Sequence, residues 1–121
     1  MKKILIVDDS PSIRRTVCDI LVGEDFSVDQ AEDGLQGLEV AKSGSYDLII
    51  SDYHMPKMIG MSLVKELRNI EQYKKIPILV CSSESDPNLK KKGKEIGVSG
   101  WLLKPIDKIN FEQNVRKLLK M

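Results

Sequence analysis

The chain has 121 residues, of which 41% are hydrophobic and 31% are charged, and its formal net charge is +1. This composition is typical of one globular domain and argues against a disordered chain. The near-neutral charge gives no general attraction to nucleic acid or to a membrane. No apolar run approaches the roughly 20 residues of a membrane span, and the short run after the first three residues lacks the length of a signal peptide.

The two cysteines, Cys18 in a helical pattern and Cys81 at the end of a strand, resemble small buried apolar residues. They do not form the spacing pattern of a disulfide framework. We therefore expect a reduced, cytoplasmic protein.

The first half of the chain alternates apolar runs with helical patterns. Residues 3–7 predict a buried strand that leads into Asp8 and Asp9. Ser10 and Pro11 then provide an N-cap and a first helical residue. The apolar spacing of the helix that follows predicts one buried face, formed by Ile13, Val17, Ile20 and Leu21.

Residues 26–31 alternate weakly and predict an edge strand, whose inward positions are Phe26 and Val28, with Gln30 as a third candidate. A second helix begins at residues 33–34, and its inward positions are Leu35, Leu38 and Ala41. Residues 48–50 then predict a buried central strand that ends on Asp52.

In the second half, residues 60–70 predict a helix with Leu63, Leu67 and Ile70 at helical spacing. Residues 77–81 predict a fourth buried strand, which is followed by Ser82. Asp86 and Pro87 pair a cap with a first-turn proline, so a helix is expected over residues 87–96. Residues 101–103 predict a fifth strand, and the last helix carries an apolar face formed by Phe111, Val115, Leu118 and Leu119.

Five strands that alternate with five helices predict an α/β fold with parallel strands and right-handed crossovers. The strands are continuously apolar, so both faces of the sheet should be covered by helices. No linker, low-complexity tract or internal repeat divides the chain. We expect residues 1–121 to form one domain with no effector domain.

Polar side chains follow four of the five strands. Asp8 and Asp9 follow the first strand, Asp52 ends the third, Ser82 follows the fourth and Lys104 follows the fifth. Each one alone could serve only as a cap, a turn residue or a solvated strand end. The carboxyl ends of parallel strands share one edge, however, and in open α/β sheets this edge is where ligands bind.

Three carboxylates gathered at one edge would repel each other strongly, at about 4 kcal/mol for two charges ~4 Å apart at an effective dielectric constant of ~20. A hard cation among them relieves this repulsion, and oxygen ligands with open water positions favour Mg²⁺. A carboxylate beside such a metal, a lysine and a hydroxyl can attack a phosphoryl group in line. The product would be an aspartyl phosphate.

With these motifs in this order, the sequence resembles a response-regulator receiver domain, in particular the single-domain chemotaxis type. The motifs are Ile6-Val7-Asp8-Asp9, Asp52-x-x-Met55-Pro56, Ser82 and Gly100-Trp101-x-x-Lys104-Pro105. The resemblance covers the whole chain. It implies a flavodoxin-like sheet with the strand order 2-1-3-4-5.

The resemblance also implies a role for each site residue. Asp52 would accept the phosphoryl group from a phosphohistidine of a sensor histidine kinase. Asp9, Asp52 and the backbone carbonyl of His54 would ligate Mg²⁺ directly, and Asp8 would act largely through water. Lys104 would pair with the phosphoryl oxygens. The switch residues would be Ser82, which hydrogen-bonds the phosphoryl group, and Trp101, which turns inward.

Two further expectations concern prolines. Lys104-Pro105 is expected to be a cis peptide, although only ~5% of X-Pro bonds are cis in folded proteins. The bend at Met55-Pro56 would turn the His54 carbonyl toward the metal.

Three positions depart from the common family pattern. Ile59 stands where an aspartate is usual, which exposes an apolar side chain near the site. Trp101 replaces a smaller aromatic residue, and its indole needs a hydrogen-bond partner when it is buried. His54 lies where the family varies; with Glu84 it is expected to tune the lifetime of the phosphorylated state, and its imidazole is a poor ligand for Mg²⁺.

A basic run lies in the predicted fourth helix, at Lys90, Lys91, Lys92 and Lys94. It can be a solvated face with some favourable interaction with the helix dipole. It can also be a docking surface, because the family uses the fourth helix, fifth strand and fifth helix for output. Nucleic-acid binding is not expected, because there is no basic stripe elsewhere and no recognition module.

The sequence therefore predicts a phosphorylation-dependent switch, a monomer that is not itself an enzyme on external substrates. Its expected output is the binding of another protein, with a flagellar-motor switch component suggested by the chemotaxis resemblance. One alternative is a phosphorelay intermediate or phosphate sink. A remote alternative is a Mg²⁺-dependent aspartyl phosphohydrolase, disfavoured because Asp8 and Asp9 are adjacent and no cap insertion exists. A degenerate receiver is disfavoured because every chemical residue is present.

Overall fold

The computed structural model describes residues 1–21, 23, 25–55, 57–83 and 86–121. Its five strands are β1 (Lys2–Val7), β2 (Phe26–Ala31), β3 (Leu48–Asp52), β4 (Ile78–Ser82) and β5 (Gly100–Leu103). They form one parallel sheet in the order β2-β1-β3-β4-β5. The predicted α/β fold and the 2-1-3-4-5 order are confirmed.

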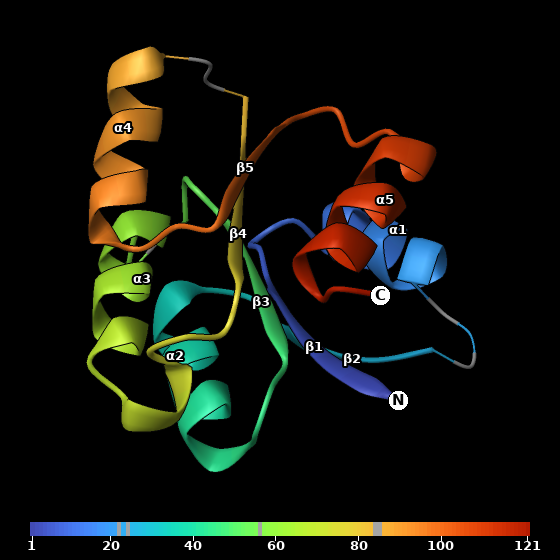
Figure 1. The fold of residues 1–121 in the computed structure, drawn as a ribbon, viewed down its shortest axis with the longest axis horizontal. Coiled ribbons are helices and arrows are strands. Elements are labelled where there is room, and N and C mark those ends of the chain that lie inside the picture. Colours follow the sequence, from blue (N-terminus) through green and yellow to red (C-terminus); the bar gives the residue numbers. More distant parts are fainter. Residues whose placement is uncertain (22, 24, 56, 84–85) are drawn as a thin grey trace.

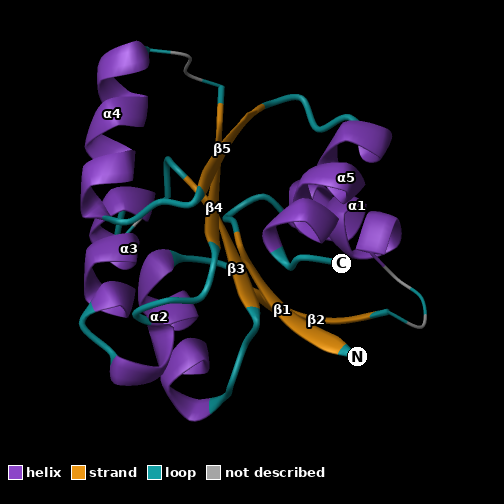
Figure 2. Cartoon of the chain, viewed as in Figure 1, coloured by secondary structure: helices purple, strands orange, loops and turns teal. Residues whose placement is uncertain are grey.

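The helices are α1 (Pro11–Leu21), α2 (Gly34–Ser43), α3 (Gly60–Arg68), α4 (Pro87–Ile96) and α5 (Lys108–Leu118). A short 3-10 helix, η1 (Glu71–Tyr73), follows α3 and was not predicted. Figure 1 shows α1 and α5 on one side of the sheet and α2, α3 and α4 on the other, and Figure 2 shows the same two helical layers in purple around the strands. In the part of the chain that the structure describes, no helix combines the length and apolar character needed to cross a membrane.

The core has two halves because successive residues of a strand point to opposite faces of the sheet. In β1, Ile4 and Ile6 pack with the residues of α1 and α5, whereas Leu5 and Val7 pack with those of α2 and α3. Strands β3 and β4 are buried along their whole length. The sheet therefore carries helices on both faces, as the continuous apolar runs predicted.

The predicted helix caps are present. The Ser10 hydroxyl accepts from the Ile13 amide at 3.3 Å, and the Asp86 carboxylate accepts from the Asn88 amide at 2.9 Å. Both cysteines are free. Burial raises the pKa of the Cys81 thiol to about 12, so this side chain behaves as an inert core residue.

Two predicted inward positions are wrong. Leu35 is 47% exposed, because α2 instead presses Gly34 and Gly37 against the rest of the domain. A Cβ at Gly37 would come within 2.8 Å of the Val7 side chain. Only a residue without a side chain can pack this closely, so the glycines determine which face of the helix is buried. Gln30 is also exposed, and its side-chain oxygen accepts from Nε of Arg14 at 3.1 Å.

The start of α3 lacks a side-chain cap. Ile59 occupies the N-cap position with extended backbone angles and makes no capping hydrogen bond. We expect Ile59→Asp to raise the free energy of unfolding by about 1 kcal/mol, since its carboxylate can accept from the first-turn amides and favours the positive end of the helix dipole. Urea unfolding measures the change. Ile59→Ala, which adds no cap, is the control and should show no such gain.

Candidate functional site at the carboxyl edge of the sheet

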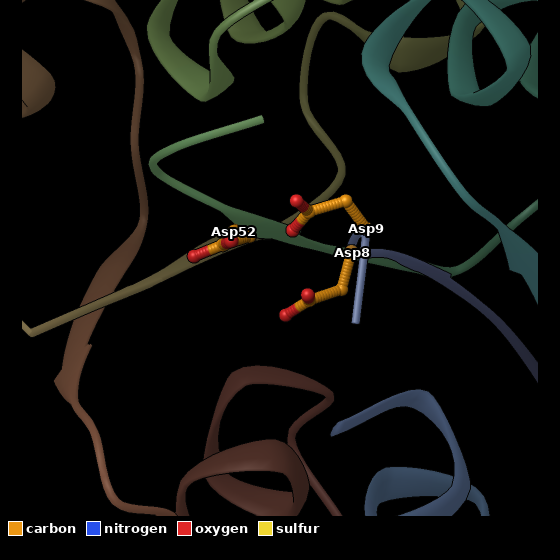
Figure 3. A group of neighbouring side chains, drawn as sticks. All are labelled: Asp8, Asp9 and Asp52. Carbon is orange, nitrogen blue, oxygen red and sulfur yellow. The ribbon is translucent and has the colours of Figure 1, made fainter. Parts of the chain in front are cut away.

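The predicted cluster of carboxylates exists at one edge of the sheet. Asp8 and Asp9 follow β1, and Asp52 is the last residue of the neighbouring strand β3. Figure 3 shows the three side chains as neighbours at this edge, and one ligand oxygen of each lies within 4.8 Å of the others. Because β1 and β3 are adjacent and parallel, their ends bring together residues that lie more than 40 positions apart.

Asp8 is the most enclosed of the three carboxylates, with 1% exposure. One of its oxygens accepts from the Ser10 amide at 2.9 Å. Burial raises the pKa of the Asp8 carboxyl, and the nearby Asp52 charge adds to the rise, although the Ser10 amide and Lys104 act in the opposite direction. A second positive charge at this site would therefore be favourable.

Lys104 bridges two of the carboxylates. Its Nζ lies 3.0 Å from Oδ1 of Asp52 and 3.2 Å from Oδ2 of Asp8. Partial burial works to lower the pKa of Lys104, but the hydrogen bond to Asp52 and the charge of Asp8 outweigh it, so the pKa is raised. This lysine is fully charged at neutral pH and is held beside the third strand end.

The net negative charge of the cluster favours the binding of a divalent cation. Three carboxylates against one ammonium leave two negative charges uncompensated, and Asp9 is exposed to solvent at the mouth of the cluster. Carboxylate oxygens with a solvent-facing side are the ligands that Mg²⁺ prefers. The residues present therefore fit this metal, and Asp8, Asp9 and Asp52 are the carboxylates that would hold it.

Ser82 and Lys104 are fixed by the pairing of the last two strands. Ser82, buried to 1% exposure, ends β4, and its carbonyl accepts from the Lys104 amide at 2.9 Å. The Lys104-Pro105 peptide is cis, as predicted. The structure thus places the predicted hydroxyl and lysine on adjacent strand ends at the carboxylate edge.

An aromatic side chain that the sequence did not single out lies between the site and the predicted switch residue. The ring of Tyr53, which directly follows Asp52, lies 5.7 Å from that of half-buried Trp101 and 4.6 Å from that of exposed His54. The inward turn of Trp101 and the ligation by the His54 carbonyl remain predictions. The predicted bend at Pro56 and the role of Glu84 fall outside the described residues.

Gly60 is a second residue that the sequence did not mark as part of the site. Its amide donates to the Tyr53 carbonyl at 2.9 Å, and a Cβ at this position would collide with the carbonyl oxygen of Asp52. The glycine therefore lets the start of α3 sit directly against the end of β3. A glycine at the first residue of a helix, eight positions after a strand-end acid, was the available signal.

Known proteins resemble this chain over nearly its whole length. The profile described as "Response regulator receiver domain" matches residues 4–116. Chemotaxis protein CheY-3 of Vibrio cholerae is 33% identical over 119 residues, which cover 98% of this chain and 92% of that protein. Chemotaxis protein CheY of Pseudomonas aeruginosa is 30% identical, with 98% and 96% covered.

Solved structures agree with these relatives. Chemotaxis response regulator CheY4 of Vibrio cholerae has a TM-score of 0.93 and 40% sequence identity, and the similarity covers 98% of each chain. The receiver domain of the Pseudomonas aeruginosa sensor kinase PA1611, described with a magnesium ion in its active-site cleft, has a TM-score of 0.89 over 99% of this chain and 98% of that one; at 22% identity it shows the shared fold. The chain belongs to the response regulator receiver domain family, the phosphorylation-dependent switches of two-component signalling, and it resembles the chemotaxis proteins CheY-3, CheY and CheY4 named above.

Proposed function

We propose that Asp52 is the phosphoacceptor of this chain. The observation that carries the proposal is the pairing of Asp52 with Lys104 at 3.0 Å beside two further carboxylates. Asp52 ends a fully buried strand, so its backbone is rigid, whereas its carboxylate faces the open edge of the sheet. A nucleophile held on a rigid element can meet an incoming phosphoryl group in line.

The donor we propose is the phosphohistidine of a sensor histidine kinase. In the transfer, the P–N bond of the donor breaks and a bond forms between phosphorus and a carboxylate oxygen of Asp52. Lys104 then exchanges its contact with the Asp52 oxygen for a contact with the phosphoryl oxygens, which its position makes possible without a large movement. The Ser82 hydroxyl, on the adjacent strand end, donates to another of these oxygens.

Asp8, Asp9 and Asp52 would hold Mg²⁺ during this reaction, together with the His54 carbonyl. The metal, when bound, supplies positive charge that offsets the negative charge of the phosphoryl group. The contribution of the chain itself is positional, because the buried Asp8 is locked by the Ser10 amide and by Lys104. A bound cation would relieve the repulsion among the carboxylates, and this relief favours its binding.

The product acts as a signal, and the chain is not an enzyme that turns over an external phosphomonoester. Phosphorylation would draw Ser82 toward the phosphoryl group and let Trp101 move, which changes the face formed by α4, β5 and α5. The output we propose is cytoplasmic binding of a protein of the flagellar-motor switch. The chemotaxis names of the relatives support this choice of partner.

Incubation with acetyl phosphate and Mg²⁺ tests the assignment. We expect one phosphoryl group per chain, labile to hydroxylamine as an acyl phosphate, and no incorporation into Asp52→Asn. Asp47→Asn is the matched control, because this carboxylate lies at the other end of β3, where it accepts from the Lys3 amide. It should label as the wild type does.

Labelling that persists in Asp52→Asn would remove the proposed role of this residue. Sustained release of phosphate from an external phosphomonoester, over many cycles per chain, would instead favour the phosphohydrolase alternative.

A further inference from the structure

A groove lies between α3 and α4. It has a volume of about 400 Å³, and its apolar lining consists of Tyr53, Ile59, Met61, Leu89 and Ile96. The volume falls within the roughly 300–1,000 Å³ of ligand pockets, and a mostly apolar lining is typical of such sites. Figure 1 shows α3 and α4 side by side on the same face of the sheet.

The groove exists because α4 buries few side chains against the rest of the domain. Gly93 is the buried residue of this helix, and a Cβ there would lie 3.2 Å from the Trp101 ring and 3.5 Å from the Met61 side chain. The helix therefore touches the body of the domain along a glycine, while Leu89 and Ile96 are only partly buried on the groove side. Apolar surface is left accessible where a packed helix would normally cover it.

The rim of the groove is positively charged. Lys65 from α3 and Lys92 from α4 line it, and Glu95 is the acid among the described lining residues. The basic run of α4 is thus divided by the structure. Lys90 and Lys94 instead line a separate hollow of about 250 Å³ beside β5 and Trp101, on the output face described above.

Ile59 joins the groove to the phosphorylation site. Its side chain is 46% exposed, and it directly precedes Gly60, which packs on the carbonyl of Asp52. An exposed isoleucine at this position has no structural purpose as a cap, since it makes no capping hydrogen bond. The aspartate that the family resemblance leads one to expect here would place a negative charge on the rim and remove an apolar contact.

We propose that the groove between α3 and α4 is a docking site for an acidic segment of a partner protein, with large apolar side chains in the groove and carboxylates on Lys65 and Lys92. Charge complementarity selects this occupant, because the rim is basic and the floor is apolar. A second copy of the chain is disfavoured, since a two-fold contact would bring the same lysines against each other. The site does not require the chain to be phosphorylated.

A designed peptide tests the proposal on the full, unphosphorylated chain. The probe is a fluorescein-labelled peptide in which Leu-Phe pairs alternate with Glu-Asp pairs, and anisotropy measures its affinity. Two companion peptides replace the acids by lysine or the apolar residues by serine. We expect saturable binding of the first peptide alone, with amide chemical-shift changes centred on Ile59, Met61 and Leu89.

Variants locate the binding. Ile59→Asp should weaken binding about tenfold or more while leaving the domain at least as stable as the wild type, so a loss cannot be attributed to unfolding. Ile59→Asn removes the apolar contact without the charge and should weaken binding less. Lys65→Glu and Lys92→Glu should weaken it about fivefold or more, whereas Lys91→Glu, the same change outside the residues that line the groove, should not.

Several outcomes would overturn the proposal. They are the absence of binding at millimolar peptide, equal binding of the lysine peptide, and affinity that is unchanged in Ile59→Asp. Concentration-dependent dimerisation that Ile59→Asp abolishes would show that the occupant is a second copy. Binding to phosphatidylglycerol vesicles that Ile59→Asp abolishes would show that it is a membrane surface. Because no phosphodonor is present, these results stand apart from the labelling of Asp52.

Discussion

Replacement of Arg68 by methionine should lower the free energy of unfolding by about 3 kcal/mol, the largest stability change that we expect from a single substitution outside the apolar core. The Arg68 guanidinium donates to three backbone carbonyls. Nη1 lies 2.7 Å from the Tyr73 oxygen and 2.7 Å from the Ile76 oxygen, and Nη2 lies 2.5 Å from that of Gly97. One side chain thus joins the end of α3 to the loops that precede β4 and β5.

The cost is large because no other donor from the described residues reaches these carbonyls in the same geometry. Each orphaned buried acceptor costs about 1–3 kcal/mol, and access of water to this partly buried site keeps the total near the lower bound. Burial lowers the pKa of Arg68, because the guanidinium is partly removed from water. Methionine retains much of the aliphatic packing, so the change isolates the lost hydrogen bonds.

Urea unfolding followed by far-UV circular dichroism measures this effect. Arg116→Met is the matched control, because Arg116 pairs with Asp25 and Glu112 at the surface. Its unfolding midpoint should move by only a small fraction of the shift in Arg68→Met, since exposed ion pairs contribute little. Equal shifts in the two variants would show that the three carbonyl contacts are not the source of stability.

Asp8→Asn should stabilise the metal-free protein and weaken its response to Mg²⁺. The ionised Asp8 carboxylate is buried beside Asp52, and its pKa is raised, mainly by burial. When the pKa of a carboxyl group is higher in the folded than in the unfolded state, the free energy of unfolding falls as the pH rises from the unfolded-state pKa to the folded-state pKa. Above the folded-state pKa this penalty on stability is complete. Above that range the wild type therefore carries the full penalty, and the amide removes it.

We expect a gain of about 1 kcal/mol without metal, well below the ~4 kcal/mol of a bare pair of charges, because Lys104 already offsets the repulsion. Lys104 keeps its shorter contact, 3.0 Å to Asp52, in the variant. With Mg²⁺ bound, we expect the wild type to be more stable than Asp8→Asn. The wild type gains about 2.7 kcal/mol at a metal concentration 100 times the dissociation constant, whereas the loss of a charged neighbour should weaken metal affinity 10-fold or more in the variant.

Urea unfolding with and without Mg²⁺ tests both halves of this expectation. Fluorescence of Trp101, the single tryptophan, reports the metal titration. Asp9→Asn is the control, because this exposed carboxylate should gain less stability without metal while losing at least as much affinity. If Asp8→Asn is less stable than the wild type in the absence of Mg²⁺, burial of the charge is not the dominant cost at this site.

The arrangement of Asp8, Asp9, Asp52, Ser82 and Lys104 could be predicted from the sequence because each follows a short apolar run. Such runs are local signals, and parallel strands necessarily end at a common edge. The caps at Ser10 and Asp86 were predictable for the same reason, since a capping side chain acts on amides two or three residues away. These predictions required no knowledge of contacts between distant segments of the chain.

Other features depended on contacts between distant segments. The buried face of α2 is formed partly by glycines that pack closely against other parts of the domain. The apolar spacing therefore predicted a buried Leu35, which is exposed. The hydrogen bonds of Arg68 reach residues up to 31 positions away, and arginine in a last helical turn has many ordinary explanations. The division of the lysine run between two hollows follows from where α4 lies against α3 and β5.

The fold class, the strand ends and the residue types that meet at the carboxyl edge can all be predicted from the sequence, because apolar periodicity and capping act over a few residues. The tertiary structure alone decided that Lys104 bridges Asp8 and Asp52, and that the α3–α4 groove combines an exposed isoleucine with two lysines. These features arise from the distances between packed elements. Such distances depend on side-chain volume across the whole core, which no local pattern encodes.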